Sequence, residues 1–302
     1  SYTDMRLNSL LKTFPDGIPL DLTAKLLPTS ARIKFSLLFH IFLHARSQKK
    51  YEAHSISKKS VFFGKHSFLG LIDSLENAIK NLSWTPSKTV WTDYYSQSNQ
   101  ISYDDVSLVE KKSLVKKYLE TVLPKSLWDI GANTGLYSQI AASLGISTIS
   151  IDSDPSVVEQ NYQEVKRAKE ENILPLVVNI ANPTPAVGFE NQERLSLLSR
   201  PHPDAVLALA LVHHLSIGNN LPFSHLAKFF SGLCRDLIIE FIPKDDKQAK
   251  LLLQNREDIF ESYHQTAFES EFSQFFQIQK KTILTDSKRI LYLKVKKKYQ
   301  NG

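Results

Sequence analysis

Only one cysteine and one methionine occur among the 302 residues of this chain. A single thiol, Cys234, excludes a disulfide framework within the chain and fits a reducing compartment, so we expect a cytoplasmic location. Because Cys234 stands just before a predicted buried strand, we interpret it as a packing residue and not as a nucleophile.

Long apolar runs are also missing from the sequence. No apolar stretch approaches the roughly 20 residues that span a bilayer, and no secretory signal peptide is recognised at its start. We therefore expect no membrane span. With 42% apolar residues and a length that allows a catalytic domain plus a smaller region, the composition predicts a soluble globular protein.

Several motifs with a defined chemistry are absent. The glycine-containing loop at residues 131–135 is not followed by Gly-Lys-Ser/Thr, which excludes a Walker loop, and it lacks the G-x-G-x-x-G spacing of dinucleotide sites. His40 and His44 lie one helical turn apart, but no third ligand is evident nearby and no H-E-x-x-H pattern occurs. We therefore predict no metal site and interpret both histidines as core or interface residues.

The most informative segment runs from Leu127 to Ser138. It reads as a short apolar strand that stops at an acidic residue, a loop with two glycines, and the start of a helix. Gly131 and Gly135 permit backbone conformations and a close ligand approach that a Cβ atom would block, while Asp129 can accept a hydrogen bond. An open α/β fold binds nucleoside-bearing cofactors at such junctions, although an ordinary tight turn is the alternative for this loop alone.

Three further predicted strands follow, and polar side chains stand at their ends. The second strand, 146–152, ends at Asp152, about 20 residues after the first glycine, where this architecture places the acceptor for ribose hydroxyls. The next two strands, with their polar ends, are 174–180 with Asn179 and 204–212 with His213 and His214. The almost continuous apolar run of the fourth is typical of a strand buried on both faces of a parallel sheet.

The end of the chain predicts a β-hairpin. A fifth strand at 235–243 is followed by helices at 248–260 and 266–276 and by an antiparallel pair at 277–284 and 289–295. A dinucleotide dehydrogenase would continue with parallel strands. We therefore predict an α/β fold with a doubly wound, seven-stranded, mostly parallel sheet, a C-terminal antiparallel hairpin and a mainly helical N-terminal region.

This ordered series resembles the class I S-adenosylmethionine-dependent methyltransferases, in which a closing hairpin follows the parallel βα units. The resemblance extends from residue 113 to about residue 297, and it implies S-adenosylmethionine as cofactor and methyl transfer as the reaction. It implies that Asp129, Gly131 and Gly135 hold the methionyl part and that Asp152 accepts both ribose hydroxyls. The further cofactor-binding residues that it implies are Ala132, Asn133, Ser153, Asn179, Ile180, Ala208 and Leu209.

Two residues depart from the family pattern. Asn133 replaces the middle glycine of the usual loop, and Asn179 replaces the usual carboxylate near the adenine. Asparagine tolerates the left-handed backbone region better than most residues, so we expect the loop to keep its shape. Asn179 keeps the capacity to accept a hydrogen bond but carries no charge.

Two histidines and a glutamate are candidate catalytic bases. His213 and His214 resemble the Leu-His-His-Leu element of small-molecule methyltransferases, and an imidazole titrates near neutral pH. Adjacent residues that leave a strand point in different directions, so we favour His214 over His213. The alternative is that both histidines order the loop or contact the cofactor backbone. Glu240, at the end of the fifth strand, is a second candidate.

The upstream part of the chain is predicted to form a separate region. Residues 1–104 would be mainly helical and include a lid, and residues 105–302 would form the S-adenosylmethionine-binding domain. In class I enzymes the segment before the first strand often folds over the cofactor, so Tyr94, Tyr95 and Tyr103 are candidate lid residues, with Tyr103 at the cofactor. The alternative is that these tyrosines pack the junction.

A second resemblance concerns this upstream region, whose most apolar helical pattern covers residues 31–46. The region resembles the upstream part of a poorly characterised methyltransferase family, some members of which are nodulation-associated. The related proteins extend further upstream than Ser1, so we expect the chain to be trimmed at this end.

The sequence defines the acceptor of the methyl group less well than it defines the cofactor. No Asn/Asp-Pro-Pro-Tyr/Phe motif follows the fourth strand, which disfavours amino methylation of adenine, cytosine or glutamine. We predict transfer to an oxygen or nitrogen of a small-molecule or carrier-borne acceptor. The net charge of +6 and the lysine-rich tail at 294–298 favour the alternative of an RNA methyltransferase. A non-catalytic binding module that keeps the fold is the third hypothesis.

Overall fold

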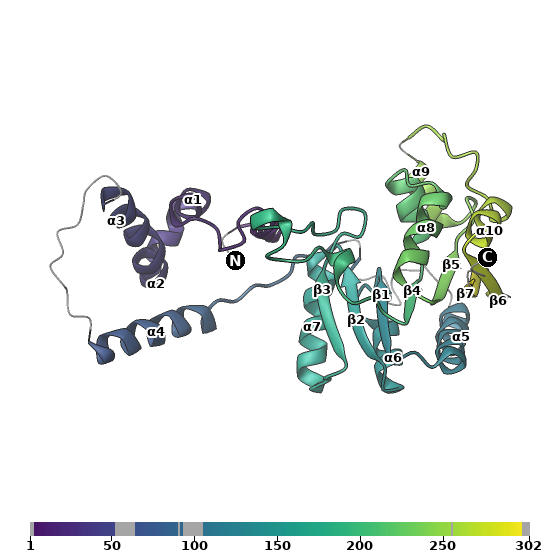
Figure 1. The fold of residues 1–302 in the computed structure, drawn as a ribbon, viewed down its shortest axis with the longest axis horizontal. Helices are drawn as coiled ribbons and strands as arrows, with labels where there is room; N and C mark the ends of the chain where they lie inside the picture. Colours follow the sequence, from purple (N-terminus) through teal and green to yellow (C-terminus); the bar gives the residue numbers. More distant parts are fainter. Residues whose placement is uncertain (1–2, 52–63, 90, 93–104, 255, 298–302) are drawn as a thin grey trace. The chain divides into compact units, whose positions relative to one another are not determined.

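The computed structural model describes residues 3–51, 64–89, 91–92, 105–254 and 256–297 (Figure 1). The chain divides into two compact units. The N-terminal unit comprises Ser1–Thr85 together with Pro185–Leu195, and the sheet unit comprises Pro86–Thr184 together with Ser196–Gly302. The division into a lid region and a cofactor domain at residue 105 stays a prediction.

A seven-stranded sheet forms the centre of the sheet unit, with the strand order β3-β2-β1-β4-β5-β7-β6. Strands β1 to β5 run parallel to one another, and β7 runs antiparallel to both of its neighbours, β5 and β6. This arrangement confirms the predicted fold class, including the closing hairpin. The strands are β1 (Ser126–Ile130), β2 (Ser147–Asp152), β3 (Ile173–Val177), β4 (Ala205–Ala208), β5 (Asp236–Phe241), β6 (Phe276–Ile283) and β7 (Ile290–Lys296).

Helices cover both faces of this sheet (Figure 1). One apolar cluster joins the sheet to α8 and α10 through large aromatic residues such as Phe230 and Phe268. The other cluster joins the opposite side chains of the strands to α5 and α6, for example through Leu119 and Ala141. The helices are α5 (Asp105–Val122), α6 (Leu136–Ser143), α7 (Pro155–Ala168), α8 (Phe223–Leu233), α9 (Lys247–Leu253) and α10 (Gln265–Ser273).

The loop after β1 has the left-handed backbone that its sequence predicts. Gly131 and Gly135 have φ angles of 79° and 83°, and Asn133 between them has a φ of 52°. The expectation that asparagine can take the place of the middle glycine is therefore confirmed. The amides of Gly131 and Ala132 both donate to the Ile151 carbonyl oxygen, at 2.8 and 3.0 Å, so the loop is fastened to β2.

Several strands are shorter than predicted, among them the third and the fourth. The apolar run expected as a strand over 204–212 leaves the sheet at Ala208, because Ala210 adopts a φ of 48° and its amide donates to the Glu240 carboxylate. The third strand ends at Val177, three residues before the predicted end at residue 180. There Asn179 closes a turn in which its side-chain oxygen accepts the amide of Ala181, at 2.9 Å.

The segment after β5 also differs from the prediction. The helix expected over 248–260 is the shorter α9, which begins where the Asp246 carboxylate accepts the amide of Gln248 at 2.8 Å and ends at Leu253. Further along, the Asp258 carboxylate accepts the amide of Phe260 at 3.1 Å, and this part of the segment is not helical.

The described part of the N-terminal unit contains helices and a small β-bridge between Val187 and Arg194. The helix predicted over 31–46 is interrupted at Lys34, whose extended backbone has a ψ of 116°. The helical segments of this unit are Met5–Lys12, α1 (Leu20–Leu26), Thr29–Ile33, α2 (Phe35–Leu37), Leu38–Leu43, α3 (His44–Tyr51) and α4 (Lys65–Lys80). Within the described ranges, no helix of either unit is both long and apolar enough to cross a membrane.

Candidate functional site

A cavity of about 270 Å³ lies at the carboxyl ends of strands β1 to β4. It belongs entirely to the sheet unit. Its lining consists of residues at the ends of these strands or just after them, residues of a short π-helix at His214–Gly218, and one residue, Trp91, upstream of α5. The lining residues are Trp91, Ile130, Gly131, Asn133, Ile151, Asp152, Ser153, Val178, Asn179, Ile180, Leu209, Ala210, Leu211, His214, Leu215, Gly218 and Asn219.

Asp152, the last residue of β2, organises one side of the cavity. One carboxylate oxygen accepts the amide of Asn133 and the other accepts the amide of Asp154, both at 2.9 Å. Burial raises the pKa of Asp152, and these two backbone amides oppose that shift. Because each carboxylate oxygen has more than one lone-pair site, the group can accept further hydrogen bonds from a ligand in the cavity.

Apolar side chains form the wall beside Asp152. Ile151, Val178 and Ile180 line the cavity together with the amide-bearing Asn179. A mostly apolar lining with a few hydrogen-bonding groups is typical of sites that bind small molecules. The backbone turn after Asn179 sets the position of this wall.

The opposite wall is built by the turn after β4. Leu209, Ala210 and Leu211 all line the cavity. A Cβ atom at Gly131 would lie 3.2 Å from the Leu211 Cδ1 atom, so the glycine loop and this turn pack closely. Gly131 is therefore needed for two reasons, its positive φ angle and this close approach.

His214 faces the cavity next to Trp91. The two ring centroids lie 5.1 Å apart with an interplanar angle of 81°, an edge-to-face contact. Burial lowers the pKa of His214 to about 4, so the imidazole is neutral at neutral pH. The side-chain amide of Asn133 donates to the Trp91 carbonyl oxygen at 2.9 Å, which connects Trp91 to the glycine loop.

His213 has a different environment from its neighbour. It is fully buried and does not line the cavity, although its ring centroid lies 4.0 Å from that of His214. Burial lowers the pKa of His213 well below its usual range, and the nearby His214, Arg289 and Lys111 act in the same direction. The structure therefore brings His214, and not His213, to the cavity.

Glu240 also lies behind the cavity wall. Its side chain is fully buried, and one carboxylate oxygen accepts hydrogen bonds from Lys111 Nζ at 2.6 Å and from the amide of Ala210 at 2.8 Å. It does not line the cavity. The Glu240 carboxylate therefore binds groups of the protein and does not face the space where a ligand would lie. This position does not suit a catalytic base.

The residues implied by the methyltransferase resemblance divide into those that line the cavity and those that do not. The lining residues among them are Gly131, Asn133, Asp152, Ser153, Asn179, Ile180 and Leu209, and the others are Asp129, Ala132, Gly135 and Ala208. Asp129 is buried, and its carboxylate accepts the Ser138 hydroxyl at 2.7 Å. Burial raises the pKa of Asp129 to about 6. Tyr94, Tyr95 and Tyr103 lie outside the described residues.

Several cavity residues were not predicted from the sequence. Trp91 belongs to the segment considered as a lid, but only its tyrosines were singled out. An aromatic residue close to those tyrosines was the signal that could have found it. No signal in the sequence predicts the π-helix at His214–Gly218. Lys111, which does not itself line the cavity, has the sequence context of a surface residue on a lysine-rich helix.

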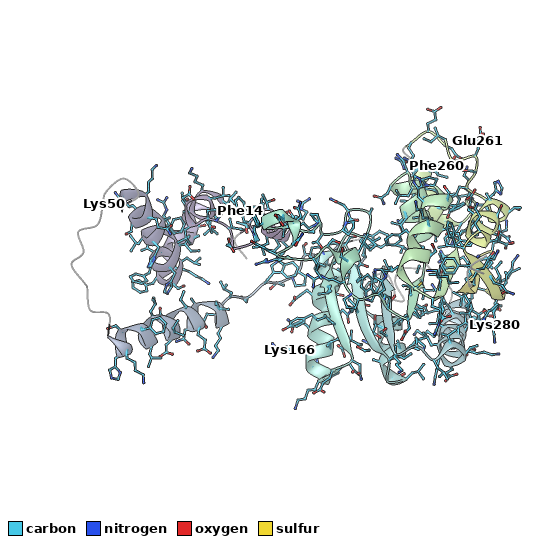
Figure 2. All side chains as sticks on the ribbon, in the orientation of Figure 1. Phe14, Lys50, Lys166, Phe260, Glu261 and Lys280 are labelled. Carbon is cyan, nitrogen blue, oxygen red and sulfur yellow. The ribbon has the colours of Figure 1, made fainter. Side chains whose placement is uncertain are left out.

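Basic side chains do not gather around the cavity. Among its described lining residues, Asp152 is the only one with a carboxylate, and none is a lysine or arginine. Figure 2 shows Lys166 and Lys280 at the two ends of the sheet. Lys166 belongs to α7, a helix that packs against the edge strand β3, and Lys280 belongs to β6, the strand at the opposite edge. The described lining of the cavity therefore offers no basic side chain to an RNA phosphate.

No family model matches the chain. The nodulation protein NoeA of Rhizobium meliloti (strain 1021) is 31% identical over 303 residues, which cover 97% of this chain and 62% of NoeA. The chain thus spans 62% of the length of this relative. This similarity agrees with the predicted resemblance of the upstream region to nodulation-associated proteins.

Two of the solved structures that this chain resembles are a candidate O-methyltransferase and an N-methyltransferase. A candidate O-methyltransferase from Nostoc punctiforme PCC 73102 has a TM-score of 0.50 and 16% identity, and the match covers 74% of this chain and 68% of that protein. The N-methyltransferase NodS from Bradyrhizobium japonicum WM9 matches at a TM-score of 0.47 with 10% identity, over 65% of this chain and 99% of NodS. The first similarity confirms the methyltransferase fold, and the second is too distant to add to it.

Proposed function

We propose that this chain, which has the class I methyltransferase fold, binds S-adenosylmethionine in the cavity at the carboxyl edge of its sheet. In this proposal it transfers the methyl group to an oxygen or nitrogen of a small-molecule or carrier-borne acceptor. The observation that carries the proposal is the place of Asp152: a carboxylate at the end of β2, facing a cavity where the strand order changes direction between β1 and β4. Open α/β sheets bind their ligands at this switch point.

The residues around the cavity suit each part of that cofactor. Asp152 would accept the two ribose hydroxyls, because an ionised carboxylate offers several lone-pair sites. Val178, Ile180 and the amide of Asn179 would hold the adenine. The backbone of Gly131 and of the turn after β4 would hold the methionyl end. When bound, the cofactor supplies a methyl group already activated by its positive sulfur.

A thermal-shift measurement tests this proposal. S-adenosylhomocysteine at about 100 times its Kd is expected to stabilise the folded protein by ~2.7 kcal/mol, which corresponds to a rise in Tm of roughly 5 to 10 °C. NAD at the same concentration is expected to leave Tm unchanged, because the loop lacks the glycine spacing of dinucleotide sites. A shift with NAD and none with S-adenosylhomocysteine contradicts the proposal.

His214 is the residue that we propose as general base. Its neutral imidazole can take the proton of the acceptor, and it does not repel a positively charged cofactor. The edge contact with Trp91 holds the ring at the cavity. Removal of a positioned base costs about 10²- to 10⁴-fold in rate, so His214→Phe is expected to lower kcat at least about 100-fold.

The control for this variant is binding of the cofactor product. S-adenosylhomocysteine is expected to bind His214→Phe with a Kd within about threefold of wild type, since the proposed role is proton transfer. His225→Phe, on the exposed side of α8, is expected to change neither quantity. Turnover is measured with the first acceptor that the wild type methylates. Full kcat in His214→Phe excludes the histidine as base.

A further inference from the structure

The most unusual contact behind the cavity is a buried ion pair between α5 and β5. Lys111 Nζ lies 2.6 Å from the Glu240 carboxylate, and the two side chains are 1% and 0% exposed. Burial lowers the pKa of Lys111, and the neighbouring carboxylate opposes this. Because moving two charges out of water costs about as much as their attraction returns, a buried pair is weak evidence for a gain in stability. The retention of this pair in the core is therefore not explained by stability alone.

Glu240 has a second contact that leads to the cavity. The oxygen bound by Lys111 also accepts the amide of Ala210, at 2.8 Å. Ala210 has a φ of 48°, in the left-handed region. This conformation is unfavourable for a residue with a Cβ atom, so it persists only where contacts with the surroundings compensate for its energy. A hydrogen bond to an ionised acceptor is stronger than one between neutral groups. The Glu240 carboxylate therefore holds the backbone of Ala210 in this conformation.

The turn held in this way is one wall of the cavity. Leu209 and Leu211, on either side of Ala210, line the cavity with it. Leu211 also packs against the loop at Gly131, where a Cβ atom would come within 3.2 Å of its side chain. A shift of the Ala210 backbone would therefore move both the wall and its contact with the glycine loop.

We propose that Lys111 and Glu240 are positioning residues that shape the turn after β4 for the methionyl end of the cofactor. This inference rests on the proposed function. In it, Glu240 supplies the acceptor for the Ala210 amide, and Lys111 donates to the same carboxylate oxygen and balances its buried charge. Neither side chain touches the ligand, so both act through the backbone of the turn.

Two double variants separate this role from a general contribution to folding. Lys111→Met/Glu240→Gln removes both charges but keeps an oxygen that can accept the Ala210 amide. Lys111→Met/Glu240→Met removes the same charges and keeps a similar volume, but it leaves no strong acceptor. Circular dichroism is used to check that each variant is folded, and calorimetric titration then measures its Kd for S-adenosylhomocysteine. We expect the Gln variant to bind within about threefold of wild type and the Met variant at least about tenfold more weakly.

An exposed ion pair provides the matched control. Lys244 Nζ lies 2.8 Å from the Asp258 carboxylate, outside the cavity lining. Lys244→Met/Asp258→Asn is expected to bind S-adenosylhomocysteine as wild type does. Wild-type affinity in the folded Lys111→Met/Glu240→Met variant overturns the inference. Absence of binding to the wild-type protein instead overturns the proposed function, so the two failures are distinguishable.

Hydrogen exchange of the wild-type protein tests the same contact without a substitution. The amide of Ala210 is expected to exchange slowly even without ligand, because the buried Glu240 carboxylate accepts it. Fast exchange of this amide in the folded protein overturns the inference, even if the Met variant does not fold.

Discussion

Replacing Asp152 by alanine is expected to weaken the binding of S-adenosylhomocysteine at least about 100-fold, because hydrogen bonds to a charged acceptor contribute ~1.5 to 3 kcal/mol each. In the proposed complex the carboxylate accepts two ribose hydroxyls, and the alanine variant can accept neither. The carboxylate also receives the amides of Asn133 and Asp154, so its loss would loosen the two loops beside the ligand. Both effects act in the same direction.

Calorimetric titration of folded protein measures this effect. Asp152→Asn is expected to lie between wild type and Asp152→Ala, because it keeps one oxygen acceptor but turns an NH₂ group toward one of the two backbone amides. Asp286→Asn, in the exposed turn between β6 and β7, is the control and is expected to bind as wild type does. A Kd within threefold of wild type for Asp152→Ala would place the ribose acceptor elsewhere.

The second large effect is expected on stability, from Gly135→Ala. Gly135 has a φ of 83°, and a Cβ atom there would lie 2.4 Å from the Asn161 side-chain oxygen. Asn161 is buried, and its amide donates to the Ser150 hydroxyl at 2.7 Å, so it cannot move away without losing that bond. Strain of the backbone and overpacking together are expected to lower the free energy of unfolding by roughly 2 to 4 kcal/mol.

Gly145→Ala is the matched control for this prediction. Gly145 has a similar φ of 75°, but a Cβ atom there would meet nothing within 4 Å. Its substitution therefore measures the backbone strain alone, expected at about 1 kcal/mol. Denaturant unfolding gives both values. Equal losses in the two variants would mean that Asn161 does not pack against the loop as the structure has it.

The strands of the sheet were predictable where turn-forming or charged residues stand at their ends. Gly145 and Asp152 bound β2, and the observed strand differs from the predicted one by a single residue at its start. The end of β4 was not predictable, because the apolar run through Val212 contains no residue that favours a turn. The turn at Ala210 depends on the carboxylate of Glu240, which is distant in the sequence.

Only part of the candidate site was predictable from the sequence. Asp152 and Asn179 follow neighbouring parallel strands, whose carboxyl ends meet at one edge of the sheet, so their presence in one cavity follows from the pattern. The place of Trp91 depends on its contacts with Asn133 and His214, which are distant in the sequence, so local sequence does not determine it. The burial of Lys111 depends likewise on how α5 packs against β5.

A crystal structure of the protein with S-adenosylhomocysteine bound tests the central claim most directly. The account predicts that the ligand occupies the cavity, with both ribose hydroxyls within hydrogen-bond distance of the Asp152 carboxylate and the adenine against Val178 and Ile180. It also predicts that the sulfur lies on the side of the turn after β4, near His214. A ligand bound elsewhere, or bound in the cavity with its ribose away from Asp152, would contradict it.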